Sequence, residues 1–182
     1  MLVIRHSESQ FNTRQTYDYN SSLSVKGHKQ AEELCHYLDG YAIGSNVRQK
    51  KIICSPFARC IQTAAYISCY MGLNIEIDNR LIEHIHEKNG FHFRHSNVYS
   101  INSELSIKMS DSDSRIINRV ISFYEQYKDE NVIVVTHGGP INIIQHLMKN
   151  KSLSEYPEWN PEITNCSVTD TVLDTFENFK EI

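Results

Sequence analysis

The chain has 182 residues, of which 40% are hydrophobic and 22% are charged, and its formal net charge is -4 at pH 7. This length and balance are typical of one soluble globular domain over residues 1–182, and the mild acidity argues against binding of nucleic acids or anionic membranes through a basic face. No apolar run approaches the ~20 residues that a membrane-spanning helix needs, so we expect a cytoplasmic protein.

The first predicted element is a short buried strand, Leu2 to Ile4, which runs directly into Arg5 and His6. In an open α/β sheet, ligands bind beyond the carboxyl ends of the strands. A cation and an imidazole at this position therefore indicate an anion site with a potential nucleophile. Taken alone, the same pair also fits an edge strand that ends at the surface.

A polar stretch, residues 10–22, follows with little periodicity, which predicts a loop beside the candidate site. Ser24 is a suitable N-cap for a helix over residues 27–38, whose apolar residues recur at helical spacing. Asp39 and Gly40 then indicate the end of this helix, because glycine is common just past a helix C-terminus. The pattern predicts an amphipathic helix that packs on a sheet.

The second predicted strand, residues 51–54, is again short and apolar. Ser55 fits the N-cap and Pro56 the first turn of a following helix, which places Arg59 about one turn inside that helix. The helix dipole favours acidic side chains in the first turn, so an arginine there suggests a nearby anion. A solvated surface position is the alternative interpretation of Arg59.

A third short strand, residues 74–77, and a turn at residues 78–80 lead to Glu83, which by itself also fits a surface position after the turn. The following residues, 84–106, show no clear helix or strand period. We expect a long loop or lid over the site, because long ordered loops in compact domains are usually functional. Four histidines crowd this segment at spacings that favour a polar lid over a metal site. They are His84, His86, His92 and His95.

A helix with an apolar stripe is predicted to begin at Ser112 or Ser114 and to end near residues 128–129. Residues 131–136 then form the strongest strand signal in the chain, a continuous apolar run of the kind found in central parallel strands. His137 follows this strand directly. A third strand end therefore carries a titratable side chain.

The last part of the chain contains a helix around residues 141–148, a polar loop, and a final element over residues 166–176. That final element alternates apolar and polar residues, which predicts an edge strand. Such an edge could pair two copies of the chain into a homodimer.

The cysteines are odd in number and widely scattered, without a Cys-x-x-Cys pair. This distribution favours free thiols in a reducing compartment over a disulfide framework or a zinc site. The five are Cys35, Cys54, Cys60, Cys69 and Cys166.

The charged strand ends are expected to meet, because the carboxyl ends of parallel strands share one edge of a sheet. Arg5, His6, Arg59 and His137 would repel one another there unless a multiply charged anion lay between them. Guanidinium groups match phosphate oxygens bidentately, so phosphate is the natural ligand. An imidazole with an ordinary pKa of about 6.5 can also act as a nucleophile toward phosphorus. The sequence therefore predicts an α/β fold with a phosphate site.

The motifs that carry these residues resemble those of the histidine phosphatase superfamily, in the branch that contains the cofactor-dependent phosphoglycerate mutases and the small phosphatases similar to them. The resemblance implies a three-layer α/β/α sandwich with a mostly parallel central sheet. The matches run in order over nearly the whole chain. They lie at Leu2 to Asn12, Leu23 to Ala31, Ser55 to Ala64, Arg80 to Glu83, Thr136 to Gly139 and Asn165 to Val168.

The resemblance also implies a phosphatase that needs no metal or other cofactor, because the arginines supply the positive charge. His6 would attack phosphorus to give a phosphohistidine, and Glu83 would protonate the leaving oxygen and then activate water. His137 would stabilise the transferring phosphoryl group. The residues implied to bind phosphate are Arg5, Arg59, Asn12, Ser9, Ser7 and Gly138.

Ser7 departs from the family pattern, which has glycine after the nucleophilic histidine. Glycine there would allow a close backbone approach or a positive φ, so the serine is expected to alter the geometry of the pocket. A phosphoglycerate mutase-like phosphotransferase and a catalytically silent phosphate-binding module therefore stay open as alternatives. The sequence does not reveal the small phosphorylated substrate.

Overall fold

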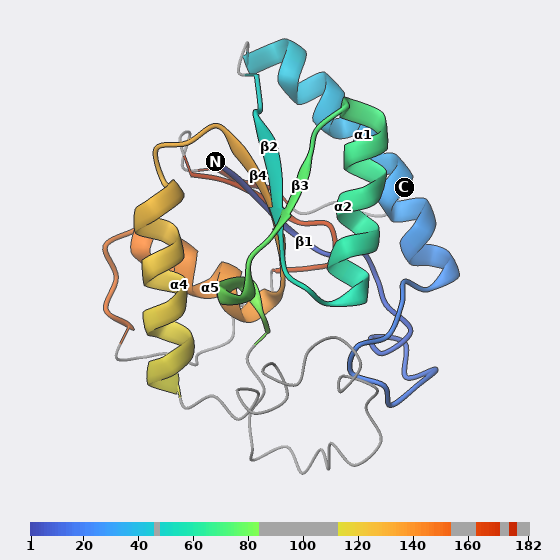
Figure 1. Ribbon diagram of the computed structural model, residues 1–182, viewed down its shortest axis with the longest axis horizontal. Helices are drawn as coiled ribbons and strands as arrows, with labels where there is room; N and C mark the ends of the chain where they lie inside the picture. Colours follow the sequence, from blue (N-terminus) through green and yellow to red (C-terminus); the bar gives the residue numbers. More distant parts are fainter. Residues whose placement is uncertain (46–47, 84–112, 154–162, 172–174, 178–182) are drawn as a thin grey trace.

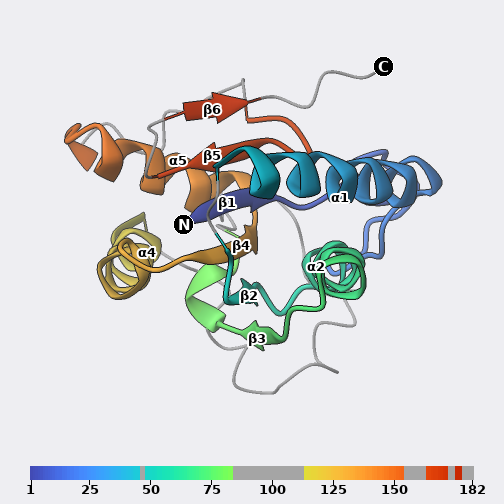
Figure 2. The ribbon, with the colours of Figure 1, turned by 90° about the horizontal axis from the view of Figure 1, so that it is seen from above.

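The computed structural model describes residues 1–45, 48–83, 113–153, 163–171 and 175–177. Within these residues, six strands form one sheet in the order β3-β2-β4-β1-β5-β6 (Figure 1, with β5 and β6 labelled in Figure 2). β1 to β4 run parallel to one another, whereas β5 and β6 are antiparallel to their neighbours. The strands are β1 (Leu2–Arg5), β2 (Lys51–Cys54), β3 (Ile75–Ile77), β4 (Val132–Thr136), β5 (Val168–Asp170) and β6 (Thr175–Glu177).

Helices cover both faces of the sheet, so the predicted three-layer α/β/α sandwich is confirmed. One face carries α1 (Val25–Ser45) and α2 (Ala58–Met71), and the other carries α4 (Asp113–Tyr127) and α5 (Gly138–Met148) (Figure 2). The side chains of β1 alternate between the two cores. Leu2 and Ile4 pack on the α1 and α2 side, whereas Val3 packs on the α4 and α5 side.

The position of β4 decides where the candidate site lies. This strand is buried along its whole length between β1 and β2, as its continuous apolar run predicts. Arg5 at the end of β1 is in register with Thr136 of β4, and Cys54 at the end of β2 is in register with Val135. The three junctions that carry Arg5, Arg59 and His137 therefore lie next to one another.

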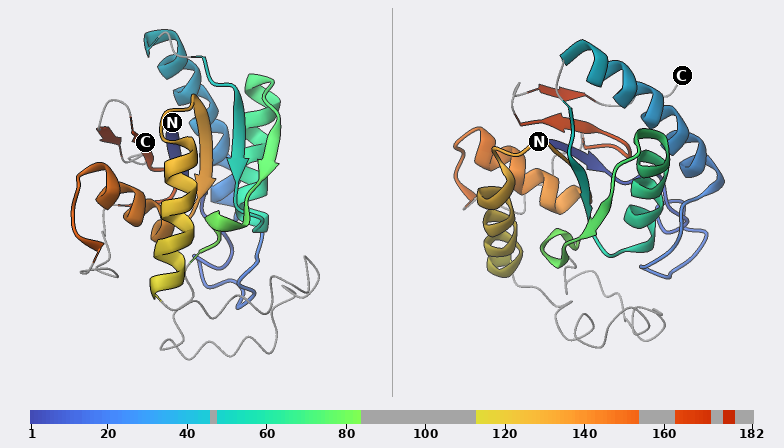
Figure 3. Two further views of the ribbon diagram at one scale, coloured as in Figure 1. Left: turned by 60° about the vertical axis from the view of Figure 1, so that its left-hand side comes forward. Right: turned by 45° about the horizontal axis from the view of Figure 1, so that its top comes forward.

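Two further segments reach the same end of the sheet. They are the loop of residues 10–22 and the short 3-10 helix η1 (Asn79–Leu81), which lie at one end of the molecule in Figure 1 and in both views of Figure 3. The predicted lid, residues 84–106, and its four histidines lie outside the described residues. Among the described helices, none is long and apolar enough to cross a membrane.

The predicted end of the first helix is wrong. Asp39 and Gly40 do not stop α1, which continues to Ser45. Beyond Gly40, the hydroxyl of Tyr41 donates to the carboxylate of Asp170 on β5, and just before Gly40 the hydroxyl of Tyr37 donates to the carboxylate of Glu177 on β6. These long-range contacts outweigh the local preference of glycine for a helix terminus.

The predicted single edge strand over residues 166–176 is also wrong in part. Two strands lie in this region, and β5 pairs with both β1 and β6 instead of forming an edge. The residues of β5 are all buried, whereas β6 exposes alternate residues and forms the edge of the sheet. Two copies of the chain that paired through this edge of the sheet would therefore do so through β6. A homodimer stays a prediction.

Gly27 allows the start of α1 to approach the segment after His6. A Cβ atom at Gly27 would lie 1.9 Å from the carbonyl oxygen of Glu8, which is a backbone atom that cannot swing aside. The same segment is held by Ser24, whose backbone N–H donates to the carbonyl of Glu8 and whose hydroxyl donates to its carboxylate. The start of α1 thus supports the segment that follows His6, the candidate nucleophile.

Gly27→Ala is expected to lower the free energy of unfolding by about 1–3 kcal/mol, because the new methyl group forces α1 away from Glu8. Gly40→Ala is the matched control within the same helix. Nothing lies within 4 Å of a Cβ atom there, so this change is expected to stabilise the protein by about 0.5–1 kcal/mol. Urea unfolding of both variants measures the difference, and equal effects would contradict the close contact.

Candidate active site

His6 follows β1 directly and is buried at the carboxyl edge of the sheet. Its backbone N–H donates to the carbonyl of Thr136 at 2.9 Å, which ties it to the end of β4. Its Nδ1 lies 2.7 Å from the carbonyl oxygen of Ser7. Because a carbonyl oxygen only accepts hydrogen bonds, we assign the ring proton to Nδ1. The Nε2 atom of His6 therefore carries the lone pair.

Arg59 connects His6 with the second imidazole. Its Nε donates to Nε2 of His6 at 3.1 Å, and its Nη2 donates to Nδ1 of His137 at 3.2 Å. Its Nη1 donates to the backbone carbonyl of Tyr19. Because a guanidinium group only donates, both imidazole nitrogens that face Arg59 are acceptors.

His137 follows β4 directly, occupies the N-cap of α5 and is fully buried. Since its Nδ1 accepts from Arg59, its Nε2 carries the proton and donates to Oγ of Ser55 at 2.8 Å. The ring centroids of His6 and His137 are 5.1 Å apart. The prediction that Ser55 caps α2 is wrong, because Phe57 occupies that N-cap and Ser55 orients the second imidazole.

Both imidazoles are held in the neutral form. Burial lowers the pKa of His6 and that of His137 well below 6.5, and the positive charge of Arg59 lowers both pKa values further. A buried neutral imidazole with a lone pair on Nε2 is the form that nucleophilic attack requires. His6 meets this requirement at neutral pH.

Arg5 is held by residues from the far end of the chain. Its Nη1 donates to the carbonyl of Ile163 at 2.5 Å, and the N–H of Cys166 donates to the carbonyl of Arg5 at 3.1 Å. Burial lowers the pKa of Arg5, while the negative charge of Glu83 opposes this shift. Arg5 and Glu83 thus act on each other within one site.

Glu83 lies at the N-terminus of α5. Its Oε1 accepts a hydrogen bond from the N–H of Gly139 at 3.0 Å, a favourable position for a carboxylate at a helix start. Gly139 is two residues beyond His137. The carboxylate therefore lies at the same helix start as the second imidazole, and its place in the site was implied by the family resemblance alone.

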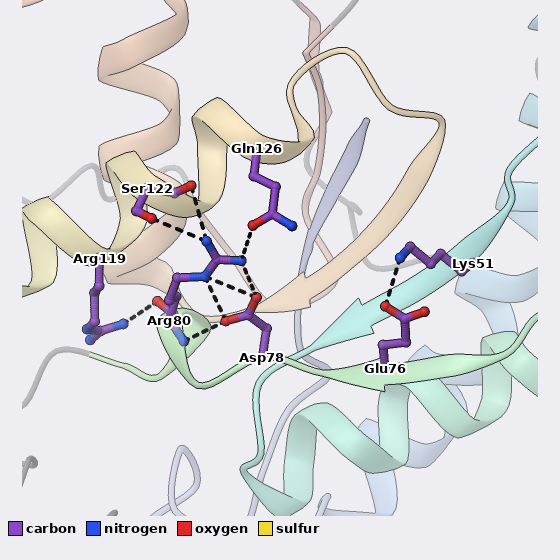
Figure 4. A network of polar contacts seen from close by, with 7 residues as sticks. All are labelled: Lys51, Glu76, Asp78, Arg80, Arg119, Ser122 and Gln126. Atoms are coloured by element: carbon purple, nitrogen blue, oxygen red, sulfur yellow. Dashed lines mark hydrogen bonds and ion pairs between the residues drawn. The ribbon is translucent and has the colours of Figure 1, made fainter.

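The turn that precedes Glu83 is anchored to α4 through Arg80 (Figure 4). The guanidinium of Arg80 binds the carboxylate of Asp78 at 2.6 Å and donates to the carbonyl of Ser122 on α4 at 3.2 Å. Arg119 of α4 donates to the carbonyl of Arg80 at 2.5 Å. These contacts fix the direction in which the chain leaves η1 toward Glu83.

Asn12 is oriented by its neighbours. Its Oδ1 accepts from the N–H and the hydroxyl of Ser9 at 3.0 and 2.9 Å. Asn165 donates from Nδ2 to the carbonyl of His6 at 2.9 Å and to Oδ1 of Asn12 at 3.4 Å. The amide oxygen of Asn12 is thus committed to these contacts, so its Nδ2 is the group suited to a phosphate oxygen.

Ser7 directs its hydroxyl toward Cys166. Its Oγ lies 3.0 Å from Sγ of Cys166, and its N–H donates to Oγ1 of Thr63 at 3.1 Å. Among the described non-glycine residues, a positive φ occurs at Arg14, Asn150 and Cys166, so Ser7 does not need the glycine conformation. Of the two residues in this contact, Cys166 is the one with a left-handed backbone conformation.

The structure therefore brings the predicted core of the site together at one edge of the sheet. Gly138 is buried at the start of α5, and its phosphate-binding role stays a prediction, as do those of Ser7 and Ser9. Residues that contact this core directly but were not predicted to belong to it include Tyr19, Ser55 and Asn165. The described residues contain no group of three or more His, Cys, Asp or Glu side chains that could hold a metal ion.

Comparison with known proteins places this geometry in context. Residues 1–179 match the family model described as "Histidine phosphatase superfamily (branch 1)". A relative from Hydrogenobacter thermophilus, named "Putative phosphoserine phosphatase 2", is 27% identical over 188 residues, which cover 93% of this chain and 87% of the relative.

Solved structures share the fold. A mycobacterial glucosyl-3-phosphoglycerate phosphatase with bound VO3 has a TM-score of 0.66 and 17% identity, with 93% of this chain and 88% of that chain covered. A phosphoserine phosphatase from Entamoeba histolytica in complex with 3-phosphoglyceric acid has a TM-score of 0.63 and 17% identity, with 92% and 87% covered. At these identities the likeness concerns the fold.

Because both imidazoles are neutral in the folded protein, we expect the protein to lose stability in mild acid. The ordinary pKa of an imidazole is 6.5, but the pKa of each ring lies well below that value in the folded protein, so below pH 6.5 the unfolded chain binds more protons. The free energy of unfolding is expected to fall as the pH drops through this range, by up to about 1.4 kcal/mol per pH unit for each ring. Urea unfolding at about pH 7.5 and about pH 5.5 measures the slope. The slope is expected to be smaller in His6→Gln, and an unchanged slope would contradict the neutral state of His6.

Proposed function

The chain belongs to the histidine phosphatase superfamily, branch 1, and is a phosphatase, and we propose that it hydrolyses small phosphate monoesters through a phosphohistidine on His6. The observation that carries the proposal is the state of His6. Its Nδ1 proton is held by the carbonyl of Ser7, its Nε2 carries the lone pair, and Arg59 contacts that same Nε2 atom. The nucleophilic Nε2 of His6 and the anion-binding guanidinium of Arg59 therefore face each other, so a phosphate bound by Arg59 lies next to the nucleophile.

In the first step, Nε2 of His6 forms a bond to phosphorus while the bond between phosphorus and the ester oxygen breaks. Glu83, which takes up a proton when the phosphate ester binds beside it, donates that proton to the departing oxygen, so the leaving group is a neutral alcohol. The guanidinium of Arg59 exchanges its bonds to the imidazoles for bonds to the phosphoryl oxygens. Arg5 adds donors for the charge that develops on these oxygens, and His137 becomes a donor at Nδ1 when it takes up a proton as the anion binds and Arg59 releases that nitrogen.

In the second step, water attacks phosphorus and the bond to Nε2 breaks. Glu83, now ionised, takes a proton from the water, and inorganic phosphate and neutral His6 result. The hydrogen bond from Nδ1 to the carbonyl of Ser7 is retained throughout, so the ring returns to the same tautomer. The positive charges of Arg5 and Arg59 supply what a metal ion supplies in other phosphatases.

The proposed substrates are small phosphorylated metabolites. The names of the similar proteins refer to phosphoserine and glucosyl-3-phosphoglycerate, which are small phosphate monoesters. The five cysteines are free, which favours a reducing compartment such as the cytoplasm. A phosphotransferase would differ by returning the phosphoryl group to substrate, and stimulation by a bisphosphoglycerate with an isomerised product would reveal it.

Hydrolysis of p-nitrophenyl phosphate in the presence of EDTA tests the proposal. His6→Ala is expected to lower kcat/KM by more than about 1000-fold, because it removes the nucleophile. Glu83→Gln is expected to lower kcat by about 100-fold, because it removes the transferable proton. Rapid quenching of the wild-type enzyme should trap an acid-labile phosphoryl group that is absent from His6→Ala.

His36→Ala is the control, because His36 is exposed on α1 and contacts Tyr70 instead of the site. It should leave the rate unchanged. Equal rates for the wild type and His6→Ala would overturn the nucleophile assignment. Tight phosphate binding without turnover of any phosphoester would instead favour a binding module.

A further inference from the structure

Tyr19 is a residue that the proposed reaction does not use. It lies in the loop of residues 10–22, where its ring packs edge-on against Phe11 at 5.0 Å and against Phe57 at 5.5 Å between centroids. The next residue, Asn20, accepts a hydrogen bond from the N–H of Ala58 at the start of α2. The loop is therefore docked on α2, and Tyr19 has a fixed position.

Tyr19 contacts Arg59 through its backbone and its ring. Its carbonyl accepts from Nη1 of Arg59, and its ring centroid lies 5.1 Å from Cζ of Arg59. The ring of Phe57 lies 4.9 Å from the same Cζ atom. Two aromatic rings thus hold the guanidinium in the direction that brings it to His6 and His137.

The phenol of Tyr19 lies within the same charged cluster. The ring that carries it lies beside the guanidinium of Arg59, and the charges of Arg59 and Glu83 both act on the phenol. Burial raises the pKa of this phenol far above its ordinary value, the charge of Glu83 raises it further, and Arg59 opposes the shift. The phenol is therefore neutral at any working pH and is a hydrogen-bond donor.

We propose that the phenol of Tyr19 is a further substrate-binding group of this site, which donates a hydrogen bond to an oxygen of the phosphate ester that Arg59 holds. This inference rests on the proposed function. A phosphate ester drawn to Arg59 comes within reach of the phenol, because the ring of Tyr19 lies beside the guanidinium, with its centroid 5.1 Å from Cζ of Arg59. A neutral donor also suits the position, since it adds a hydrogen bond without adding a further positive charge beside Arg5 and Arg59.

Tyr19→Phe tests the phenol, because it removes the hydroxyl and keeps the ring against Arg59, Phe11 and Phe57. The variant is expected to bind inorganic phosphate about tenfold more weakly and to lose about tenfold in kcat/KM for p-nitrophenyl phosphate. Tyr17→Phe is the matched control in the same loop, because Tyr17 is 86% exposed. It should match the wild type in both measurements.

Calorimetric titration with inorganic phosphate is repeated in the Arg59→Ala background. There the added Tyr19→Phe change is expected to have little effect, because the phosphate is no longer held beside the phenol. A structural role would instead lower Tm and leave phosphate affinity unchanged in Tyr19→Phe, and that result would overturn the inference.

Wild-type phosphate affinity in Tyr19→Phe, or an equal loss in both backgrounds, would overturn it as well. These outcomes leave the proposed function intact when the wild type still binds phosphate and hydrolyses the ester. A wild-type protein that does neither would overturn both proposals.

Discussion

The parallel pairing of β4 with β1 on one side and β2 on the other is the constraint on which the site depends. It places the ends of three strands side by side, so that His6, Arg59 and His137 approach one another from distant parts of the sequence. None of these side chains has a local reason to meet the others. Buried apolar residues on both faces fix the register of the sheet, and this register brings the site residues together.

Burial and charge act in the same direction within this cluster. A guanidinium group lies between two imidazoles, and three cations there would repel one another in a medium that screens charge poorly. The structure avoids this because burial and Arg59 together favour the neutral rings, whose nitrogen lone pairs then accept from the guanidinium. The arrangement that stabilises Arg59 in the folded protein is thus also the one that keeps His6 unprotonated.

Much of the fold and of the site could be predicted from local patterns. The apolar run before Thr136 predicted the central strand, and the junctions at the ends of three strands predicted that Arg5, His6, Arg59 and His137 meet. The errors concern tertiary contacts that local preference does not contain. Ser55 has the side chain of an N-cap but bonds His137, and α1 passes through Gly40, where Tyr37 and Tyr41 on either side of the glycine bond Glu177 of β6 and Asp170 of β5. Tyr19 lies outside the matched motifs, and the motif that contains Asn165 does not indicate a contact to His6, since the contacts of both residues to the site exist only in the folded chain.

The order of strands in the sheet has a consequence for how the chain is made. β1 is synthesised first, yet its two neighbours in the sheet are β4 and β5, which begin at Val132 and Val168. A growing chain therefore carries an apolar strand without either of its final hydrogen-bonding partners until synthesis has passed β4 and β5. Folding must close long loops, and this slows the folding of the protein. During that interval the unpaired backbone groups of β1 form a site for aggregation or chaperone binding.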